Sequence, residues 1–390
     1  MKKESGITIV ALVVTIVVML ILVGVSVTVS INGGLFNTTK ESTYKTEVSQ
    51  VKEALEEEIV QRKARRESVD NITIKDLDIP NKIKDKYKDK LIIIGKDIYY
   101  DPSNIEKDNE EAWLEDMDII ANTKFFTYNT NGDTITGLSE SGYTAIENGV
   151  TKFVMPTKYV SKDANGNRKV TTITTIEKNA FNATVEGKQT CVKIKSVIFP
   201  TTLTTLKTNA FDGCNGLEKI DLSNTQVTYI GQYAFSYCMN LKEAILPENL
   251  TSLGSGAFWH CEKMEKINLG RITSVSPYCF QYCTNLKNIE IPDSVTYIAE
   301  RSFQCCSSLE KLIIPSSVTS IDIEAFMWDP AIQEIRIPSS VTTMSYNVFS
   351  QSAKGGKMYV PFTKEEGKPS GWHDAWNRSG ATIIYADETT

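Results

Sequence analysis

Three patterns of hydrophobic and polar positions follow one another along the chain. Residues 7–31 (ITIVALVVTIVVMLILVGVSVTVSI) are almost wholly apolar, and no charged residue occurs from position 5 to position 39. Residues 41–66 then place apolar side chains at three- and four-residue spacing between charged ones. From about residue 134, short apolar runs return at nearly constant intervals. The order predicts a membrane-like segment, an amphipathic helix and then a repeat array.

The segment 7–31 is long enough to cross a bilayer. As a helix it would reach about 37 Å, against about 30 Å of hydrocarbon. Lys2 and Lys3 precede it, and the first charges after it are the balanced pair Lys40 and Glu41. The positive-inside rule therefore predicts a single pass through the cell membrane, with a cytoplasmic N-terminus and an extracellular remainder. A plain signal anchor would show the same pattern.

The N-terminal residues resemble those of type IV pilins and pilin-like proteins. The resemblance lies in a short basic leader that ends at Gly6, followed by Ile7 and an unbroken apolar helix. It implies that a prepilin peptidase cleaves between Gly6 and Ile7 and that the new N-terminus is methylated. Pilins usually carry a glutamate at the fifth mature position, where this chain has Ala11. This departure argues against a role as the bulk subunit of a filament.

The segment after the span is predicted to be an amphipathic helix over 41–66. Val48, Val51, Leu55 and Ile59 would form its apolar side. Charged residues occupy most of the remaining positions, as expected for a helix that packs on one side only.

A small α+β module is predicted next. Alternating apolar and polar residues indicate strands at 71–77, 91–94, 98–100 and 124–128, and a helical turn over 110–117. The Asn-Gly pairs at 131–132 and 165–166 are typical of hairpin turns. Neither pair is followed by the acidic ligands of a calcium loop, so no metal is expected there.

The rest of the chain is a series of repeats, each marked by one phenylalanine. Their spacings are 30, 24, 23, 22, 23, 23 and 23 residues. The phenylalanines are Phe181, Phe211, Phe235, Phe258, Phe280, Phe303, Phe326 and Phe349. Each repeat also has an L-x-x-I-x-L run, often followed by proline, and a second run in which two apolar residues bracket a threonine. No single repeat can bury these residues alone, so neighbouring repeats must stack into one solenoid core.

The repeat unit, for instance SLEKLIIPSSVTSIDIEAFMW at 308–328, resembles the BspA-like leucine-rich repeats of bacterial surface proteins. The resemblance covers about residues 134–361 and implies a β-rich, right-handed leucine-rich repeat solenoid. Residues 362–390 are similar to the segment that closes such arrays. Trp372 and Trp376 in that segment would cover the last exposed edge of the core.

These patterns divide the chain into six parts. They are a basic leader (1–6), a transmembrane pilin-like helix (7–31), an amphipathic helix (32–69), a small α+β module (70–133), BspA-like leucine-rich repeats (134–361) and a C-terminal cap (362–390). The fold class is therefore an N-terminal helical region, a small α+β module and a β-rich solenoid.

Composition and motifs argue against several classes of function. A net charge of −6 and a pI near 5.3 give no electrostatic footprint for nucleic acid. The chain has two histidines, His260 and His373, and it lacks a phosphate loop, a dinucleotide fingerprint and a nucleophile elbow. We therefore expect no enzymatic activity and no cofactor.

The cysteines are predicted to pack in the core. Five of them follow the repeat phenylalanine by three residues; they are Cys214, Cys238, Cys261, Cys283 and Cys306. At such a position cysteine behaves as a small apolar residue. Disulfides between stacked turns remain an alternative, because neighbouring strands lie only about 4.8 Å apart. The absence of C-x-x-C spacings argues against zinc.

The outward positions of the L-x-x-I-x-L strands are the candidate binding surface. The first row is Lys219, Glu243, Lys266, Asn288, Lys311 and Glu334, and the second is Asp221, Ile245, Asn268, Glu290, Ile313 and Arg336. Neither row has a single charge sign or an aromatic strip, so neither indicates a ligand class. Five aromatic residues near the phenylalanine turns are either contact anchors or turn packing: Tyr233, Tyr237, Trp259, Tyr278 and Tyr282.

The function predicted from these features is binding at the cell surface. The protein would be a membrane-anchored, surface-displayed repeat protein that binds protein or glycan partners outside the cell. The alternative is a minor pilin or pseudopilin-like subunit of a type IV filament or secretion apparatus.

Overall fold

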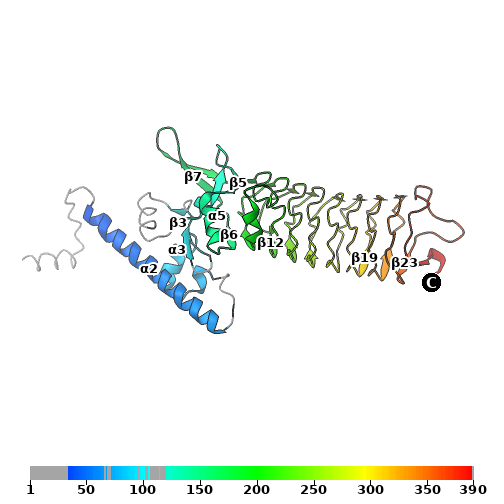
Figure 1. Ribbon diagram of the computed structural model, residues 1–390, viewed down its shortest axis with the longest axis horizontal. Helices are drawn as coiled ribbons and strands as arrows, with labels where there is room; N and C mark the ends of the chain where they lie inside the picture. Colours follow the sequence, from blue (N-terminus) through cyan, green and yellow to red (C-terminus); the bar gives the residue numbers. More distant parts are fainter. Residues whose placement is uncertain are drawn as a thin grey trace, which may run out of the picture. The chain divides into compact units, whose positions relative to one another are not determined.

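The computed structural model describes residues 34–65, 67, 72–94, 97–101, 104–105, 114 and 120–388 (Figure 1). The leader 1–6, with Gly6, and the predicted span 7–31, with Ile7 and Ala11, lie outside these residues. No helix within the described ranges is long and apolar enough to cross a bilayer.

Helix α2 (Gly34–Arg65) begins in the first of two compact units, residues 1–47, and continues in the second, residues 48–390. In the first unit Lys45 forms an ion pair with Glu41, with 2.8 Å between nitrogen and oxygen. In the second unit the predicted apolar side of the helix is buried. The buried residues are Val48, Val51, Leu55 and Ile59.

The described part of the strand predicted over 71–77, residues 72–77, is not a strand. The segment contains the short 3-10 helix η1 (Ile74–Asp76), so the strand prediction is wrong. The Asp76 carboxylate accepts hydrogen bonds from the backbone N–H and the hydroxyl of Thr73, at 2.8 and 2.9 Å. Such side-chain-to-backbone bonds favour a turn over an extended strand. Arg62 of α2 lies 3.6 Å from the same carboxylate.

The strands predicted at 91–94 and 98–100 are present, whereas the one predicted at 124–128 begins only at Phe126, because residues 122–125 form a 3-10 helix. β1 (Leu91–Ile94) pairs antiparallel with β2 (Asp97–Tyr100), and β2 pairs parallel with β3 (Ile120–Ala121). Helix α3 (Asn81–Tyr87), which the pattern does not predict, precedes this sheet. Of the helical turn expected over 110–117, only the buried Leu114 is described.

Both Asn-Gly pairs lie in hairpin turns, as predicted. β4 (Phe126–Tyr128) and β5 (Thr134–Leu138) are antiparallel, and Gly132 between them has φ +78°. β7 (Lys158–Lys162) and β8 (Arg168–Thr172) form the second hairpin, in which Gly166 has φ +80°. Positive φ is the reason that glycine occupies these positions.

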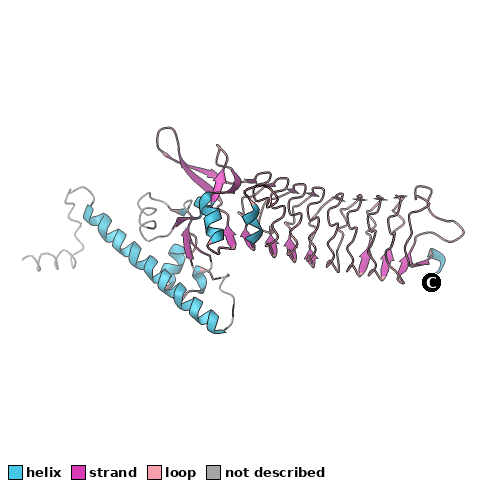
Figure 2. Ribbon diagram, in the orientation of Figure 1, coloured by secondary structure: helices cyan, strands magenta, loops and turns pink. Residues whose placement is uncertain are grey.

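The repeats coil into a β-solenoid of about eight turns, which confirms that they stack as predicted (Figure 2). The turns contribute short strands to two ladders, in which the strands of successive turns pair in parallel, and β4 joins the second ladder as an antiparallel strand. The first ladder contains β6 (Lys152–Val154), β10 (Ser196–Ile198), β12 (Lys219–Asp221), β14 (Glu243–Ile245), β16 (Lys266–Ile267), β19 (Lys311–Ile313), β21 (Glu334–Arg336), β23 (Lys357–Tyr359) and β24 (Thr382–Ile384). The second contains β4, β5, β9 (Thr175–Ile176), β11 (Thr205–Leu206), β13 (Tyr229–Ile230), β15 (Ser252–Leu253), β17 (Ser274–Val275), β18 (Tyr297–Ile298), β20 (Ser320–Ile321) and β22 (Thr343–Met344).

Short helices lie at the two ends of the array. At the N-terminal end are η3 (Asn122–Phe125), α5 (Glu140–Glu147) and η4 (Gln189–Lys193), and at the C-terminal end is η5 (Ala386–Glu388). Helix η4 lies between Phe181 and Phe211, and its residues account for the longer first spacing.

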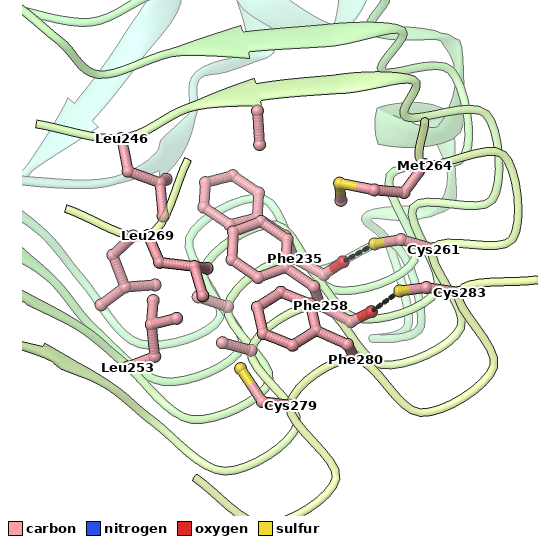
Figure 3. Close-up of a cluster of buried hydrophobic side chains, with 14 of the residues drawn as sticks. Phe235, Leu246, Leu253, Phe258, Cys261, Met264, Leu269, Cys279, Phe280 and Cys283 are labelled. Carbon is pink, nitrogen blue, oxygen red and sulfur yellow. Dashed lines mark hydrogen bonds between the residues drawn. The ribbon is translucent and has the colours of Figure 1, made fainter. Parts of the chain in front are cut away.

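The repeat phenylalanines form one continuous stack inside the solenoid, and Figure 3 shows three of them. Successive ring centroids lie 4.8–5.8 Å apart, and the ring planes are within 4–15° of parallel. The apolar residues of both ladders pack around this stack in a single hydrophobic core. Each ring contacts the ring of the next turn. The free energy gained by burying a ring therefore stabilises two neighbouring turns together.

The cysteine column lies beside the phenylalanine stack. All eight cysteines are free thiols, and five of the thiols donate hydrogen bonds of 3.1–3.4 Å to the backbone carbonyl of a phenylalanine in the preceding turn. Figure 3 shows two of these bonds, from Cys261 to Phe235 and from Cys283 to Phe258. Burial raises the pKa of each of these five thiols, so they stay protonated and can donate.

The same column contains a carboxyl group. Asp329 follows Phe326 by three residues, and Ser352 holds this position in the next turn, where its hydroxyl donates to the Phe326 carbonyl. Asp329 is fully buried, and within the described residues its carboxyl group has no side-chain hydrogen-bond partner and only a minor interaction with the backbone N–H of Cys306. Burial raises the pKa of Asp329 well above its ordinary value. The group is therefore held neutral where a surface aspartate would be ionised.

Two buried tryptophans close the C-terminal end of the core. The indole N–H of Trp372 donates to the Val341 carbonyl at 2.9 Å. Trp376 packs edge-on against Phe349, with ring centroids 6.3 Å apart. β24 adds a last strand to the first ladder, in register with β23.

A chain that ends at Pro361 should aggregate. The truncation would expose Phe349 and leave β23 as an open edge strand, which invites pairing with other chains. Size-exclusion chromatography with light scattering would show material larger than the intact protein. Removal of residues 386–390 alone is the matched control and should leave the elution unchanged. If the truncated chain elutes as the intact protein does, residues 362–390 are not needed to prevent association through the last turn.

Candidate binding surface

The first row of predicted positions forms a regular line on the first ladder. The register pairs Lys219 with Glu243 and Glu243 with Lys266. Farther along, Lys311 pairs with Glu334. All of these side chains are exposed or half-buried, whereas the residue between the two rows in each strand points into the core.

The second row is less continuous. Asp221 pairs with Ile245, and Ile313 pairs with Arg336. Asn268 and Glu290 of the same row lie where no strand is formed, so the structure does not bring them into a ladder.

The contacts within this surface are ion pairs between exposed groups. Lys219 Nζ lies 2.7 Å from a Glu243 carboxylate oxygen, and its hydrogen bond to Glu243 raises the pKa of Lys219. Arg336 bonds Glu334 at 2.6 Å, and its guanidinium lies 4.2 Å from the centre of the Tyr359 ring. Exposed ion pairs contribute only about 0–1 kcal/mol, so these charges are not what stabilises the solenoid.

Both ladders are interrupted at one turn, residues 264–280, which we call the seam turn. Its first strand, β16, pairs only with β14 in the preceding turn, and its second strand, β17, pairs only with β18 in the following turn. The next turn has a single bridge, from Asn288 to Lys311, in place of a first strand. The stacked rings of Phe258 and Phe280 are also the most widely spaced, at 5.8 Å. The seam turn thus divides the predicted surface into two segments.

The interruption follows from a shortened connection between the two strands. A regular turn has five residues such as IPDSV at 291–295, whereas the seam turn has only LGRI at 269–272. Gly270 has φ +60°, and a Cβ there would lie 2.9 Å from the Pro247 carbonyl oxygen. The short connection therefore needs glycine at this position.

Side chains replace backbone hydrogen bonds at the seam turn. Asn268 accepts from the Leu246 N–H at 2.7 Å and donates to the Leu246 carbonyl at 3.0 Å. The Ser276 hydroxyl donates to the Leu253 carbonyl, where the equivalent residue of the preceding turn, Gly254, uses its backbone N–H. These bonds satisfy the buried backbone groups that the broken ladders would otherwise leave unpaired.

A groove of about 520 Å³ opens beside the seam turn. Its rim contains Glu248, Arg271 and Glu290, and Ile267 and Pro292 contribute apolar surface. Asn268 also lines it, so two of the twelve sequence-predicted residues, Asn268 and Glu290, meet at this groove. Sequence reasoning missed Glu248 and Arg271. The signal that could have found them is the 22-residue spacing before Phe280, together with the missing proline.

The aromatic residues on the turns pack largely against one another. Tyr237, His260 and Tyr282 stack face to face, with centroids 4.8 and 4.3 Å apart. Trp259 meets Tyr237 and His260 edge-on, at 4.9 and 5.0 Å. Because neighbouring rings cover these faces, turn packing is favoured over a role as open contact anchors.

Comparisons with known proteins agree with this geometry. The family model described as BspA type Leucine rich repeat region (6 copies) matches residues 169–283 and 270–366. Among solved structures, a leucine-rich repeat protein from Bacteroides ovatus is 23% identical, covers 67% of this chain and 68% of its own, and has a TM-score of 0.50. A leucine rich cell surface protein from Faecalibacterium prausnitzii is 18% identical, with coverage of 67% and 92% and a TM-score of 0.39. No curated protein matches the chain.

The family match and the solenoid refer to the same residues. The two matched ranges together span just over half of the chain and contain all eight of the repeat phenylalanines, from Phe181 to Phe349. The likeness to the Bacteroides structure supports the fold. The chain therefore belongs to the BspA-type leucine-rich repeat proteins, a family of surface and adhesion proteins.

Proposed function

We propose that the protein is a binding module displayed at the cell surface, where its solenoid contacts protein or glycan partners. One observation carries this proposal: regularly placed side chains point outward from the first ladder, and the core does not require them. Repeat proteins use extended surfaces of this kind for binding. Membership of a family of surface and adhesion proteins supports the same function.

Attachment to the membrane is the second part of the proposal. It rests on the uncharged sequence 7–31 and on the lysines that precede it, which favour a single pass with the repeats outside. On this arrangement the solenoid would be held outside the cell by its own N-terminal segment.

Surface display and binding can be tested together. Antibodies against the solenoid should label intact cells, and the purified protein should bind members of an array of immobilised extracellular proteins and glycans. Lys311→Ala with Arg336→Ala should weaken that binding about tenfold, since interface energy is concentrated in a few residues. Lys364→Ala, an exposed lysine away from the ladder, is the control. Labelling that requires permeabilised cells would contradict the proposal.

The N-terminal sequence supports a second candidate, a minor pilin or pseudopilin-like subunit. The supporting observation is the basic leader that ends at Gly6 before Ile7, and Ala11 in place of the usual glutamate argues against a bulk role. Cell fractionation separates the two candidates. Recovery in sheared filaments favours the subunit, and recovery in membranes favours the anchored binding module.

Processing at the leader gives a direct prediction. N-terminal sequencing of the native protein should begin at Ile7, with a methylated amine, because the leader resembles that of prepilins. Gly6→Leu should block the cleavage, whereas Lys3→Arg should not. Recovery of intact Met1 in the wild type would show that the segment is a plain signal anchor.

A further inference from the structure

The groove beside the seam turn has the dimensions of a small-molecule site. In a regular turn the connection between the two strands has five residues, as in IPSSV at 314–318. The seam turn has one residue fewer, and about 520 Å³ opens beside it. Small-molecule sites usually occupy about 300–1,000 Å³.

Three charged side chains from three successive turns surround the groove. They are Glu248, Arg271 and Glu290, and none of them forms an ion pair or a side-chain hydrogen bond within the described chain. The two carboxylates can only accept hydrogen bonds, and the guanidinium can only donate them. The rim therefore offers both kinds of polar contact at short range.

The wall of the groove is fixed in place. Asn268 forms two hydrogen bonds with the backbone of Leu246, so its amide plane is held against the neighbouring strand. Ile267 and Pro292 add an apolar part, and the Leu269 side chain is buried in the core beneath the groove. A pre-formed wall lowers the conformational cost of binding.

We propose that this groove binds a short neutral oligosaccharide; the inference rests on the proposed function of a surface binding module. Each sugar hydroxyl is both a donor and an acceptor, so one ligand can satisfy Arg271 and the two glutamates together. A strongly anionic ligand would meet Glu248 and Glu290, and a strongly cationic one would meet Arg271. The C–H face of a sugar ring would lie on the apolar surface of Ile267 and Pro292, which line the groove and are half-buried.

The size of the site favours a saccharide over a protein. Specific protein interfaces bury about 1,200–2,000 Å² in total, whereas eight residues line this groove. A protein partner would need the wider face of the first ladder, which carries the separate contacts described above.

Calorimetric titration of the full chain tests the proposal. The protein is kept in a detergent without a sugar headgroup and titrated with cellotriose, maltotriose and triacetylchitotriose. At least one of the three should bind, and binding should change little between about 50 and about 500 mM salt, since a neutral ligand is not screened. Arg271→Ala and Glu290→Ala should each weaken it at least tenfold, and Lys364→Ala should leave it unchanged.

A variant in which the connection of the seam turn is lengthened to the regular five residues, called the repaired chain, gives the most direct test. Replacement of Gly270 and Arg271 by the tripeptide Pro-Asp-Ser restores the five-residue connection and the 23-residue spacing of the neighbouring turns. The repaired chain should melt at or above the temperature of the wild type, because both ladders can then continue, and it should lose saccharide binding. A folded repaired chain that binds as well as the wild type would overturn the proposal.

The experiments can reject saccharide binding at the groove without rejecting the proposed function of a surface binding module. If the folded wild type binds none of the three trisaccharides, or if binding disappears at high salt, the groove proposal is wrong. Surface labelling and the Lys311 and Arg336 variants test the binding module independently. The module can therefore be confirmed while the groove proposal is rejected.

Discussion

Phe258→Ala should lower the free energy of unfolding by about 3–5 kcal/mol, as loss of a buried aromatic side chain usually does. Phe258 is fully buried, and its ring stacks on Phe235 at 5.6 Å and on Phe280 at 5.8 Å. The substitution therefore removes contacts from two turn interfaces at once. Because stability in a repeat array is a sum over turns and their interfaces, neighbouring turns should weaken too.

The position of Phe258 next to the seam turn adds a second expectation. Here the strand ladders are interrupted, so side-chain packing carries more of the connection between the two halves of the array. Denaturant unfolding of Phe258→Ala should broaden or split into two transitions. Phe211→Ala, where both ladders are continuous, should lose similar stability in one transition, and the exposed Tyr229→Ala should change it by less than about 0.5 kcal/mol. Unchanged unfolding of Phe258→Ala would mean that the assigned core is wrong.

The register of the array could be predicted because the solenoid repeats one local rule. Each phenylalanine occupies the same place in its turn, so spacing alone identified the core column and the outward rows. The pairing of Lys219 with Glu243 and of Lys311 with Glu334 follows from that spacing. Parallel in-register stacking leaves few alternatives for such a sequence.

Departures from the repeat were harder to predict, because their consequences depend on neighbouring turns. The 22-residue spacing is visible in the sequence, but the double hydrogen bond of Asn268 with Leu246 is not. The groove rim at Glu248 and Arg271 appears only when turns of different length are stacked. In the module, the strand predicted over 71–77 failed because one carboxylate, Asp76, bonds the backbone locally.

Asp329 is the strongest departure from the cysteine column, and it should make the stability of the protein depend on pH. Its neutral carboxyl has one O–H to donate, as the thiols of the column do, whereas an ionised carboxylate would be an unpaired charge in the core. The titratable groups beside it are the buried thiol of Cys306 and the half-buried thiol of Cys305, and neither supplies a positive charge. Burial therefore raises the pKa of Asp329 well above the value of about 3.9 expected in the unfolded chain.

This shift gives the pH dependence its sign. Below the pKa that Asp329 has in the unfolded chain, the carboxyl group is neutral in both states. Its titration then does not change the free energy of unfolding. As the pH rises above that value, the unfolded chain releases the proton and the folded chain keeps it, so stability falls until the pKa of the folded state is reached. At pH 7, Asp329→Cys should therefore raise the free energy of unfolding by about 1–3 kcal/mol, the usual cost of a buried polar group whose hydrogen bonds are not fully satisfied.

The advantage of Asp329→Cys should shrink as the pH is lowered toward 4. Urea unfolding of wild type and variant at matched pH values measures the difference, in which the titration of all other carboxylates cancels. Asp329→Ser, which introduces the residue found at this position in the next turn (Ser352), should behave in the same way, and Asp221→Ser on the exposed face is the control. A difference that stays constant between pH 4 and pH 8 would mean that Asp329 does not change its protonation on unfolding, and that this buried carboxyl has a partner that keeps it ionised.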